Sequence, residues 1–165
     1  MTPMTADEIR RTFVNCSKGE AKRIGMPTLD ALPWGDLDFL GWQDPSGSQR
    51  AYLVVARSSG VVGLVLRQSA TSARTMRRST MCQLCITPHT SDGVTMSVAR
   101  KTGTAGKKGD STGLYVCRDL ACSLYIRGKK VSGVPRLRES ISVEASVARC
   151  RRNLDRFVDR VLVEG

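Results

Sequence analysis

The segment that decides the fold carries two cysteine pairs, Cys82-Gln-Leu-Cys85 and Cys117-Arg-Asp-Leu-Ala-Cys122, separated by 31 residues. Two thiolates at such spacing wrap one side of a tetrahedral ion, and the second pair closes the other side. We therefore predict one structural Zn²⁺ held by Cys82, Cys85, Cys117 and Cys122. Because four protein ligands leave no coordination position for water or substrate, this metal is expected to stabilise structure and not to catalyse hydrolysis.

Other interpretations of the cysteines stay open at the level of sequence. His89, the one histidine, follows Cys85 by four residues and is a candidate substitute ligand, or a neighbour that orients a thiolate. Cys82 and Cys85 could instead form a redox dithiol, but that motif normally opens a helix after a strand, whereas Pro88 follows the pair here. Scattered core cysteines are disfavoured because four of the six occur in close pairs.

Positive charge is concentrated around the cysteines. The chain of 165 residues has a formal net charge of +11. Residues 72–138 hold thirteen Lys and Arg against three Asp and Glu, whereas the flanking segments are nearly balanced, at eight against seven and five against five. Such a field attracts polyanions, so RNA, DNA and an acidic protein surface are all candidate partners.

Composition places the chain among globular proteins, with 41% hydrophobic and 25% charged residues. The sequence has no apolar run of 18 residues and no signal-peptide pattern at its N-terminus, so we expect neither a membrane span nor export. A cytoplasmic location is therefore expected, where thiols stay reduced and paired cysteines favour metal binding over disulfides. No nucleophile motif accompanies the histidine, so we expect neither an enzyme nor a small-molecule substrate.

Changes in composition and hydrophobic periodicity predict an α+β fold in three parts. Residues 1–71 form a small mixed N-terminal lobe, residues 72–138 the zinc module, and residues 139–165 an amphipathic helix that packs on the rest. The clearest element is a β-hairpin, because β-rich runs at 51–57 and 61–67 flank a short turn.

A helix is expected near each end of the chain. The first begins at a capping box formed by Thr5 and Glu8. Its apolar face would carry Ile9, Phe13, Val14 and Cys16. The last begins near Ser142 and spans about five turns. Between them, Trp34 and Trp42 lie in turn-rich sequence and are assigned to packing.

The zinc module is expected to contain a second hairpin. It consists of a strand at 94–101, a basic glycine-rich loop at 103–113, and a strand at 114–116 that ends at Cys117. A short helix would then begin near Cys122, where the helix dipole favours a thiolate.

Basic residues beside these elements are candidate contacts for a partner. We single out Arg77, Arg78, Lys101, Lys107, Lys108, Arg127, Lys129 and Lys130. The loop that holds Lys107 and Lys108 lacks the GxxxxGK[ST] order of a nucleotide site, so a contact with a phosphate backbone is expected there instead. Tyr115 and Tyr125 are the nearby aromatic residues and are assigned to the core, so base stacking is not indicated.

Several of these segments together resemble a known family. They are Leu37-Asp-Phe-Leu-Gly-Trp42, Cys82-Gln-Leu-Cys85, His89-Thr90, Gly113-Leu-Tyr-Val-Cys117 and Cys122-Ser-Leu-Tyr-Ile126. In this order they look like the elongation factor G-binding, FusB-type family over most of residues 37–130. The resemblance implies a treble-clef zinc finger with the four cysteines as ligands. It also implies binding to translation elongation factor G, which some members release from ribosomes stalled by fusidic acid.

The resemblance and the charge distribution predict the same kind of function. We expect a non-enzymatic protein that binds elongation factor G, the ribosome with its RNA, or both, and shifts the population of bound factor. Two alternatives are a general RNA- or DNA-binding zinc protein and a thiol redox protein.

Overall fold

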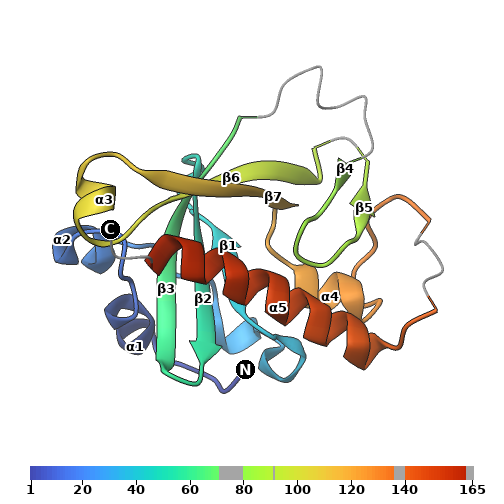
Figure 1. Cartoon of the computed structure of the whole chain (residues 1–165). Coiled ribbons are helices and arrows are strands. Elements are labelled where there is room, and N and C mark those ends of the chain that lie inside the picture. The colour runs from blue at the N-terminus through green and yellow to red at the C-terminus, as the bar shows by residue number, and fades with distance from the viewer. Residues whose placement is uncertain (71–79, 91, 136–139, 163–165) are drawn as a thin grey trace.

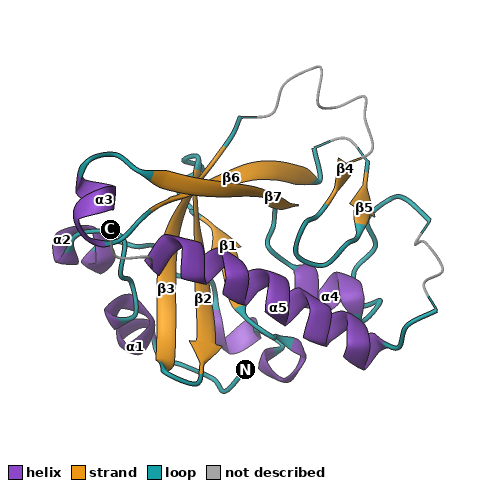
Figure 2. Cartoon of the chain, viewed as in Figure 1, coloured by secondary structure: helices purple, strands orange, loops and turns teal. Residues whose placement is uncertain are grey.

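The computed structural model describes residues 1–70, 80–90, 92–135 and 140–162. Its centre is an antiparallel sheet with strand order β1-β2-β3-β6-β7. The strands are β1 (Leu40–Gln43), β2 (Arg50–Arg57), β3 (Gly60–Gln68), β6 (Val94–Arg100) and β7 (Ser111–Cys117). A separate two-stranded sheet pairs β4 (Thr80–Met81) with β5 (Pro88–His89). Figures 1 and 2 show these short strands at one end of the molecule, beside the end of β7.

The predicted hairpin is confirmed by β2 and β3, which pair along their length from Arg50↔Arg67 to Arg57↔Gly60. The apolar run in β2 reflects burial on both faces of the sheet. Ala51, Leu53 and Val55 belong to a core cluster shared with helix α5, and the alternate residues Tyr52 and Val54 belong to a second cluster. The sheet therefore separates two cores.

Helices cover both faces of this sheet. They are α1 (Ala6–Arg11), α2 (Lys18–Lys22), the 3₁₀ helices η1 (Leu29–Ala31) and η2 (Trp34–Asp36), α3 (Gly103–Lys107), α4 (Cys122–Ile126) and α5 (Val143–Leu162). The α5 helix crosses the sheet in Figure 1 and confirms the predicted C-terminal helix, with the Ser142 hydroxyl accepting from the Ala145 N–H. Its buried residues recur at helical spacing: Ser146, Cys150, Leu154, Phe157, Val158 and Val161.

The N-terminal helix differs from the prediction after its first turn. The Thr5/Glu8 capping box is present, but α1 ends at Arg11. Phe13 then forms a parallel bridge with Gly63, because the segment pairs with an edge of β3 that β6 leaves open. A Cβ at Gly63 would lie 3.1 Å from the Phe13 nitrogen, so glycine permits this approach. The helix is therefore shorter than expected. Phe13 and Cys16 still pack in the second core cluster, but not from a helix, and Val14 is 43% exposed.

The predicted loop at 103–113 is also more ordered than expected. Its first part is helix α3, and β7 begins at Ser111 instead of at residue 114. Backbone pairing continues between Lys101 N–H and Asp110 O at 3.0 Å, which closes the hairpin around α3. A Cβ at Gly106 would overlap the Lys101 carbonyl, so this compact tip requires glycine.

The sheet continues across the predicted boundary at residue 71. β3 pairs with β6 from Leu66↔Ala99 to Gln68↔Ser97. A division at residue 71 thus separates parts of the sequence whose strands share one sheet. Within the ranges that the structure describes, no helix has the length and apolar character needed to cross a membrane.

Candidate metal centre

Four cysteine sulfurs from two turns meet in the interior. Cys82 and Cys85 lie in the turn between β4 and β5, Cys117 is the last residue of β7, and Cys122 is the first residue of α4. The four ligand atoms lie within 4.8 Å of one another, and all four residues are buried.

The spacing of these sulfurs suits zinc. A tetrahedral ion with Zn–S bonds of about 2.3 Å places neighbouring sulfurs about 3.8 Å apart. The Sγ atoms of Cys82 and Cys122 are 3.8 Å apart, and those of Cys85 and Cys117 are 3.5 Å apart. These two separations match those expected of sulfurs that share one Zn²⁺.

Each turn is shaped by a residue with a left-handed backbone. Ile86 has φ 59° and Leu120 has φ 56°, a conformation that costs a non-glycine residue about 1–2 kcal/mol. Backbone hydrogen bonds of 2.9 Å hold both turns, from Ile86 N–H to Cys82 O and from Leu120 N–H to Cys117 O. These tight turns bring the cysteines of each pair to the same side.

The pKa values of the clustered thiols are shifted in opposite directions. Hydrogen bonding with Cys117, Cys150 and Cys82, together with complete burial, raises the pKa of the Cys122 thiol well above its ordinary value. Burial opposes ionisation of Cys82 too, but hydrogen bonds from Cys117 and Cys122 outweigh it and lower the pKa of that thiol. Binding of a divalent cation would remove this difference, because every coordinating thiol loses its proton.

His89 lies beside the cluster. Its Nε2 atom is 3.3 Å from Cys117 Sγ, and its ring packs edge-on against Tyr125 at a centroid distance of 4.6 Å. Burial lowers the pKa of His89, which favours the neutral ring. A neutral imidazole with a proton on Nε2 would donate to the Cys117 thiolate, which suits a role in orienting that ligand.

The segment Leu37–Trp42 packs against the second cysteine turn and supports it, a role that the sequence did not reveal. Asp38 is buried, and its carboxylate accepts from Arg127 at 2.6 and 3.1 Å. The Asp38 N–H also donates to Ser123 Oγ at 3.0 Å. Ser123 belongs to α4 and Arg127 follows it directly, so the segment Leu37–Trp42 holds the helix that carries Cys122 in place.

Three of the predicted partner-binding cations already have partners in the chain. Arg127 pairs with Asp38. Lys129 lies 2.6 Å from Asp36, and Lys130 lies 2.7 Å from Asp119. All three cations are thus paired within the fold, but the Lys129 and Lys130 side chains stay 54% and 45% exposed, so their contact with a partner stays a prediction.

The other five predicted cations are placed differently. Arg77 and Arg78 lie outside the described residues. Lys101, Lys107 and Lys108 lie around α3, at the opposite end of the β6–β7 hairpin from the cysteines (Figure 1). β7 alone separates these ends by about 20 Å. Of the described cations, Lys101, Lys107 and Lys108 therefore lie away from the metal centre.

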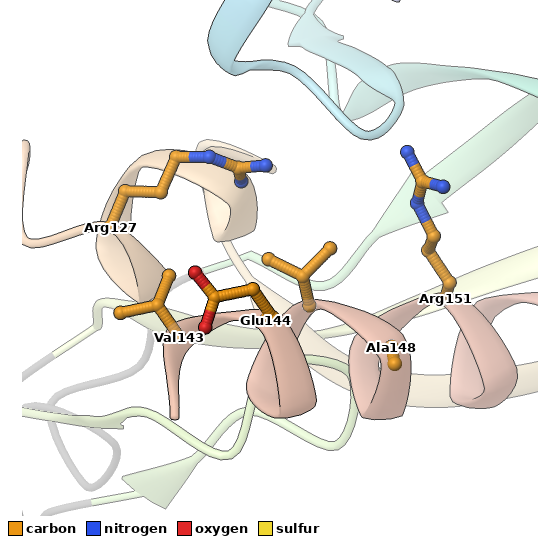
Figure 3. A pocket seen from close by; sticks show the side chains of 6 residues that line it. Arg127, Val143, Glu144, Ala148 and Arg151 are labelled. Carbon is orange, nitrogen blue, oxygen red and sulfur yellow. The ribbon is translucent and has the colours of Figure 1, made fainter. Parts of the chain in front are cut away.

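A small pocket lies between α4 and the start of α5. Figure 3 shows Arg127 and Arg151 on its rim with both guanidinium groups extending to the same side. Both form ion pairs with Asp38, Arg127 at 2.6 Å and Arg151 at 3.3 Å, so their charges neutralise that buried carboxylate. The pocket is thus part of the contact between α5 and the end of α4.

The order of these elements defines the class of protein. A cysteine turn, a β-hairpin, a second cysteine turn and a helix that begins at the last cysteine form a treble-clef zinc finger. A family model described as FBP C-terminal treble-clef zinc-finger matches residues 8–161, and the chain belongs to this family. No curated protein and no solved structure gives a significant match. The family and the buried cluster together fit one structural Zn²⁺.

The family match extends well beyond residues 37–130, where the motifs were recognised. It includes most of α1 and nearly all of α5. The structure gives a reason, since α5 supplies Cys150 next to Cys122 and Leu37–Trp42 supports α4. The residues around the finger are therefore part of the family unit.

Proposed function

We propose that this chain is a non-enzymatic, cytoplasmic zinc-finger protein that binds translation elongation factor G, the ribosome, or both, and thereby modulates translation. The observation that carries the proposal is the family match over residues 8–161, which includes the buried four-cysteine centre. The partner is taken from the motif resemblance to elongation factor G-binding proteins. Protection of the fusidic-acid type would be one consequence of such binding.

The proposal assigns the zinc ligands to Cys82, Cys85, Cys117 and Cys122. Because these sulfurs surround the centre and are buried, the ion would have no open position for water. The metal would stabilise the surface that contacts the partner, and His89 would support Cys117 as a neighbour and not as a ligand.

A thiol redox function is less compatible with this geometry. Cys82 and Cys85 lie in a turn between two short strands, whereas a thioredoxin-like pair opens a helix. Cys82 is also completely buried, with four sulfurs clustered instead of two. An attacking thiolate needs access to its substrate, which this arrangement denies.

The proposal is tested on one preparation of the native protein. Elemental analysis should give one zinc per chain, and pull-down with mass spectrometry should recover elongation factor G after nuclease treatment. Recovery of RNA alone, lost on nuclease treatment, would favour the general nucleic-acid-binding alternative. Absence of zinc would overturn the metal centre.

Cysteine variants sharpen the metal test. Cys117→Ser should lose zinc, because serine is a poor ligand for this ion and the three remaining thiolates do not complete a four-coordinate structural site. Cys16→Ser is the matched control, since Cys16 is half-buried and lies outside the cluster. Equal zinc contents in the two variants would contradict the assignment of Cys117.

A further inference from the structure

Three arginines from neighbouring strands lie on one face of the sheet. Arg50 of β2 is directly opposite Arg67 of β3, and Arg67 is opposite Val98 of β6. Arg100 lies two residues beyond Val98, and alternate residues in a strand share a face. Directly opposite Cβ atoms are about 5 Å apart and diagonal neighbours about 7–8 Å apart. The register therefore produces a continuous row of positive charge, here called the arginine row.

The arginine row lines a groove with a cavity volume of about 670 Å³. Lys101 and Lys107 extend the row from the end of β6 into α3, and both also line the groove. Glu20 is the one carboxylate among the lining residues, and it already accepts from the N–H and hydroxyl of Ser17. The groove is therefore strongly basic.

The framework of the groove holds the row in position. The Asn15 side chain bridges β3 and β6 where their backbone pairing ends. It donates to Val65 O at 3.0 Å and to Arg100 O at 3.1 Å, and it accepts from the Val65 N–H at 2.8 Å. The strands that carry Arg67 and Arg100 are thus fixed relative to each other.

The cations of the groove contrast with those near the metal centre. Over the part of the chain that the structure describes, Arg67, Arg100, Lys101 and Lys107 form no ion pair, and Arg50 has an electrostatic interaction with Glu20. Like charges directly opposite each other in a sheet are destabilising. The row therefore has a cost within the chain that a bound anion would relieve.

An exposed aromatic residue lies on the same sheet face. Arg100 is opposite Ser111 of β7, and Tyr115 lies four residues further along that strand, about 13 Å away. Tyr115 is 45% exposed, in contrast to its expected place in the core. Tyr115 does not line the groove, so an RNA strand would have to continue along the sheet face from the arginine row to reach its ring. Cationic and aromatic side chains on one surface are the combination used by proteins that bind single-stranded nucleic acid.

We propose that this groove binds single-stranded RNA, with the arginine row on successive phosphates and Tyr115 stacked on a base. The inference deepens the proposed function, because it identifies the chemistry by which the chain would contact the RNA of a ribosome. A row of neighbouring cations along one groove fits a chain of phosphates better than the scattered carboxylates of an acidic protein surface. The phosphate contacts would lie toward the start of β7, away from the zinc centre, whereas Tyr115 is two residues before Cys117.

The test measures binding of a fluorescein-labelled 12-nucleotide oligouridine by anisotropy. The triple variant R50Q/R67Q/R100Q should bind at least about tenfold more weakly, and the slope of log affinity against log salt should fall by about 2, at about 0.7 per lost contact. The control R11Q/R152Q/R156Q removes three exposed arginines from other surfaces and should weaken binding less than about threefold. Y115A should weaken binding about fivefold or more.

Several results would overturn the inference. They are undetectable binding of the oligouridine, equal weakening by the two triple variants, and an unchanged salt slope for the groove variant. Nuclease-resistant recovery of elongation factor G, measured on the same variants, separates this inference from the proposed function. Loss of the factor with full RNA binding by R50Q/R67Q/R100Q would assign the groove to a protein partner. Zinc content and thermal melting verify that each variant is folded.

Discussion

Gly41 and Leu120 lie so close that a side chain on residue 41 has no space. An ideal Cβ at Gly41 would be 2.4 Å from Leu120 Cβ. Leu120 is the left-handed residue of the second cysteine turn, and Gly41 belongs to β1. The main sheet therefore packs its backbone directly against the turn that presents Cys117 and Cys122.

Gly41→Ala is expected to destabilise the protein by about 1–3 kcal/mol, the usual cost of overpacking. Leu120 is 3% exposed and its Cβ is fixed by the turn, so the clash cannot be relieved by a rotamer change. Urea unfolding of the zinc-loaded protein measures the loss, and Gly35→Ala, with nothing within 4 Å, is the matched control.

The contact can be isolated by a double-mutant cycle. Leu120→Gly removes the offending Cβ and suits φ 56°, although it loses a buried side chain. Gly41→Ala should then cost much less in the Leu120→Gly background than in the native protein. Additive effects of the two substitutions would contradict a direct clash.

Asp38→Asn is expected to destabilise the protein by about 2–3 kcal/mol at pH 7. Breaking a fully buried pair costs about 3–5 kcal/mol, and the cost is smaller here because the Arg127 side chain is 21% exposed and keeps contact with water. Unfolding free energies of the two proteins measure the difference. Lys129→Gln, which breaks a more exposed pair with Asp36, should cost less than about 1 kcal/mol.

The contribution of Asp38 should depend on pH. Burial opposes its ionisation, but hydrogen bonds and charge from Arg127 outweigh burial and lower the pKa of Asp38 below its ordinary value of 3.8. A carboxyl whose pKa is lower in the folded state contributes stability above the unfolded pKa and loses it as pH falls. The difference between native protein and Asp38→Asn should therefore shrink below about pH 4. Comparing the two proteins cancels protonation of the cysteines, and a difference that grows in acid would contradict the assignment.

The sequence predicted the elements that depend on short-range patterns. Cys82 and Cys85 lie in one turn, and the β2–β3 hairpin follows from two adjacent β-rich runs, so local spacing contains the information. Asp38 and Arg127 are 89 positions apart, and their pairing depends on how β1 and α4 meet. Counting charges along the chain therefore could not show that Arg127 is already neutralised.

The dependence on contacts between distant parts of the sequence also explains why the end of the first helix was mispredicted and why the arginine row was missed. Phe13 was assigned to a helix by periodicity, but the open edge of β3 offers backbone partners that end the helix. Arg50, Arg67 and Arg100 occur far apart in the sequence and meet only through strand register. The predicted hairpin at 51–57 and 61–67 could have indicated that Arg50 lies opposite Arg67. Nothing in the sequence indicates that β6 pairs with β3.

His89→Phe is expected to keep one zinc per chain with about 10–100-fold weaker affinity, the typical cost of losing a residue that orients a ligand. Phenylalanine retains a ring against Tyr125 but removes the nitrogen 3.3 Å from Cys117 Sγ. Competition with a chromogenic chelator measures the affinity. A drop in zinc stoichiometry to that of Cys117→Ser would instead make His89 a ligand.

Removal of zinc should unfold the finger before the rest of the sheet. Four thiols within 4.8 Å lose their common partner, and metal binding and folding of such a site are coupled. The second core cluster, which includes Leu40, Trp42 and Tyr52, lies on the other face of the sheet and contains none of the four cysteines. Hydrogen exchange after chelation should show lost protection at Cys82–Thr87 and Leu120–Ile126, while the β2–β3 amides stay protected. Readdition of zinc should restore the protection. Uniform loss would show that the fold depends on the metal throughout, and unchanged exchange would show that the cysteines hold none.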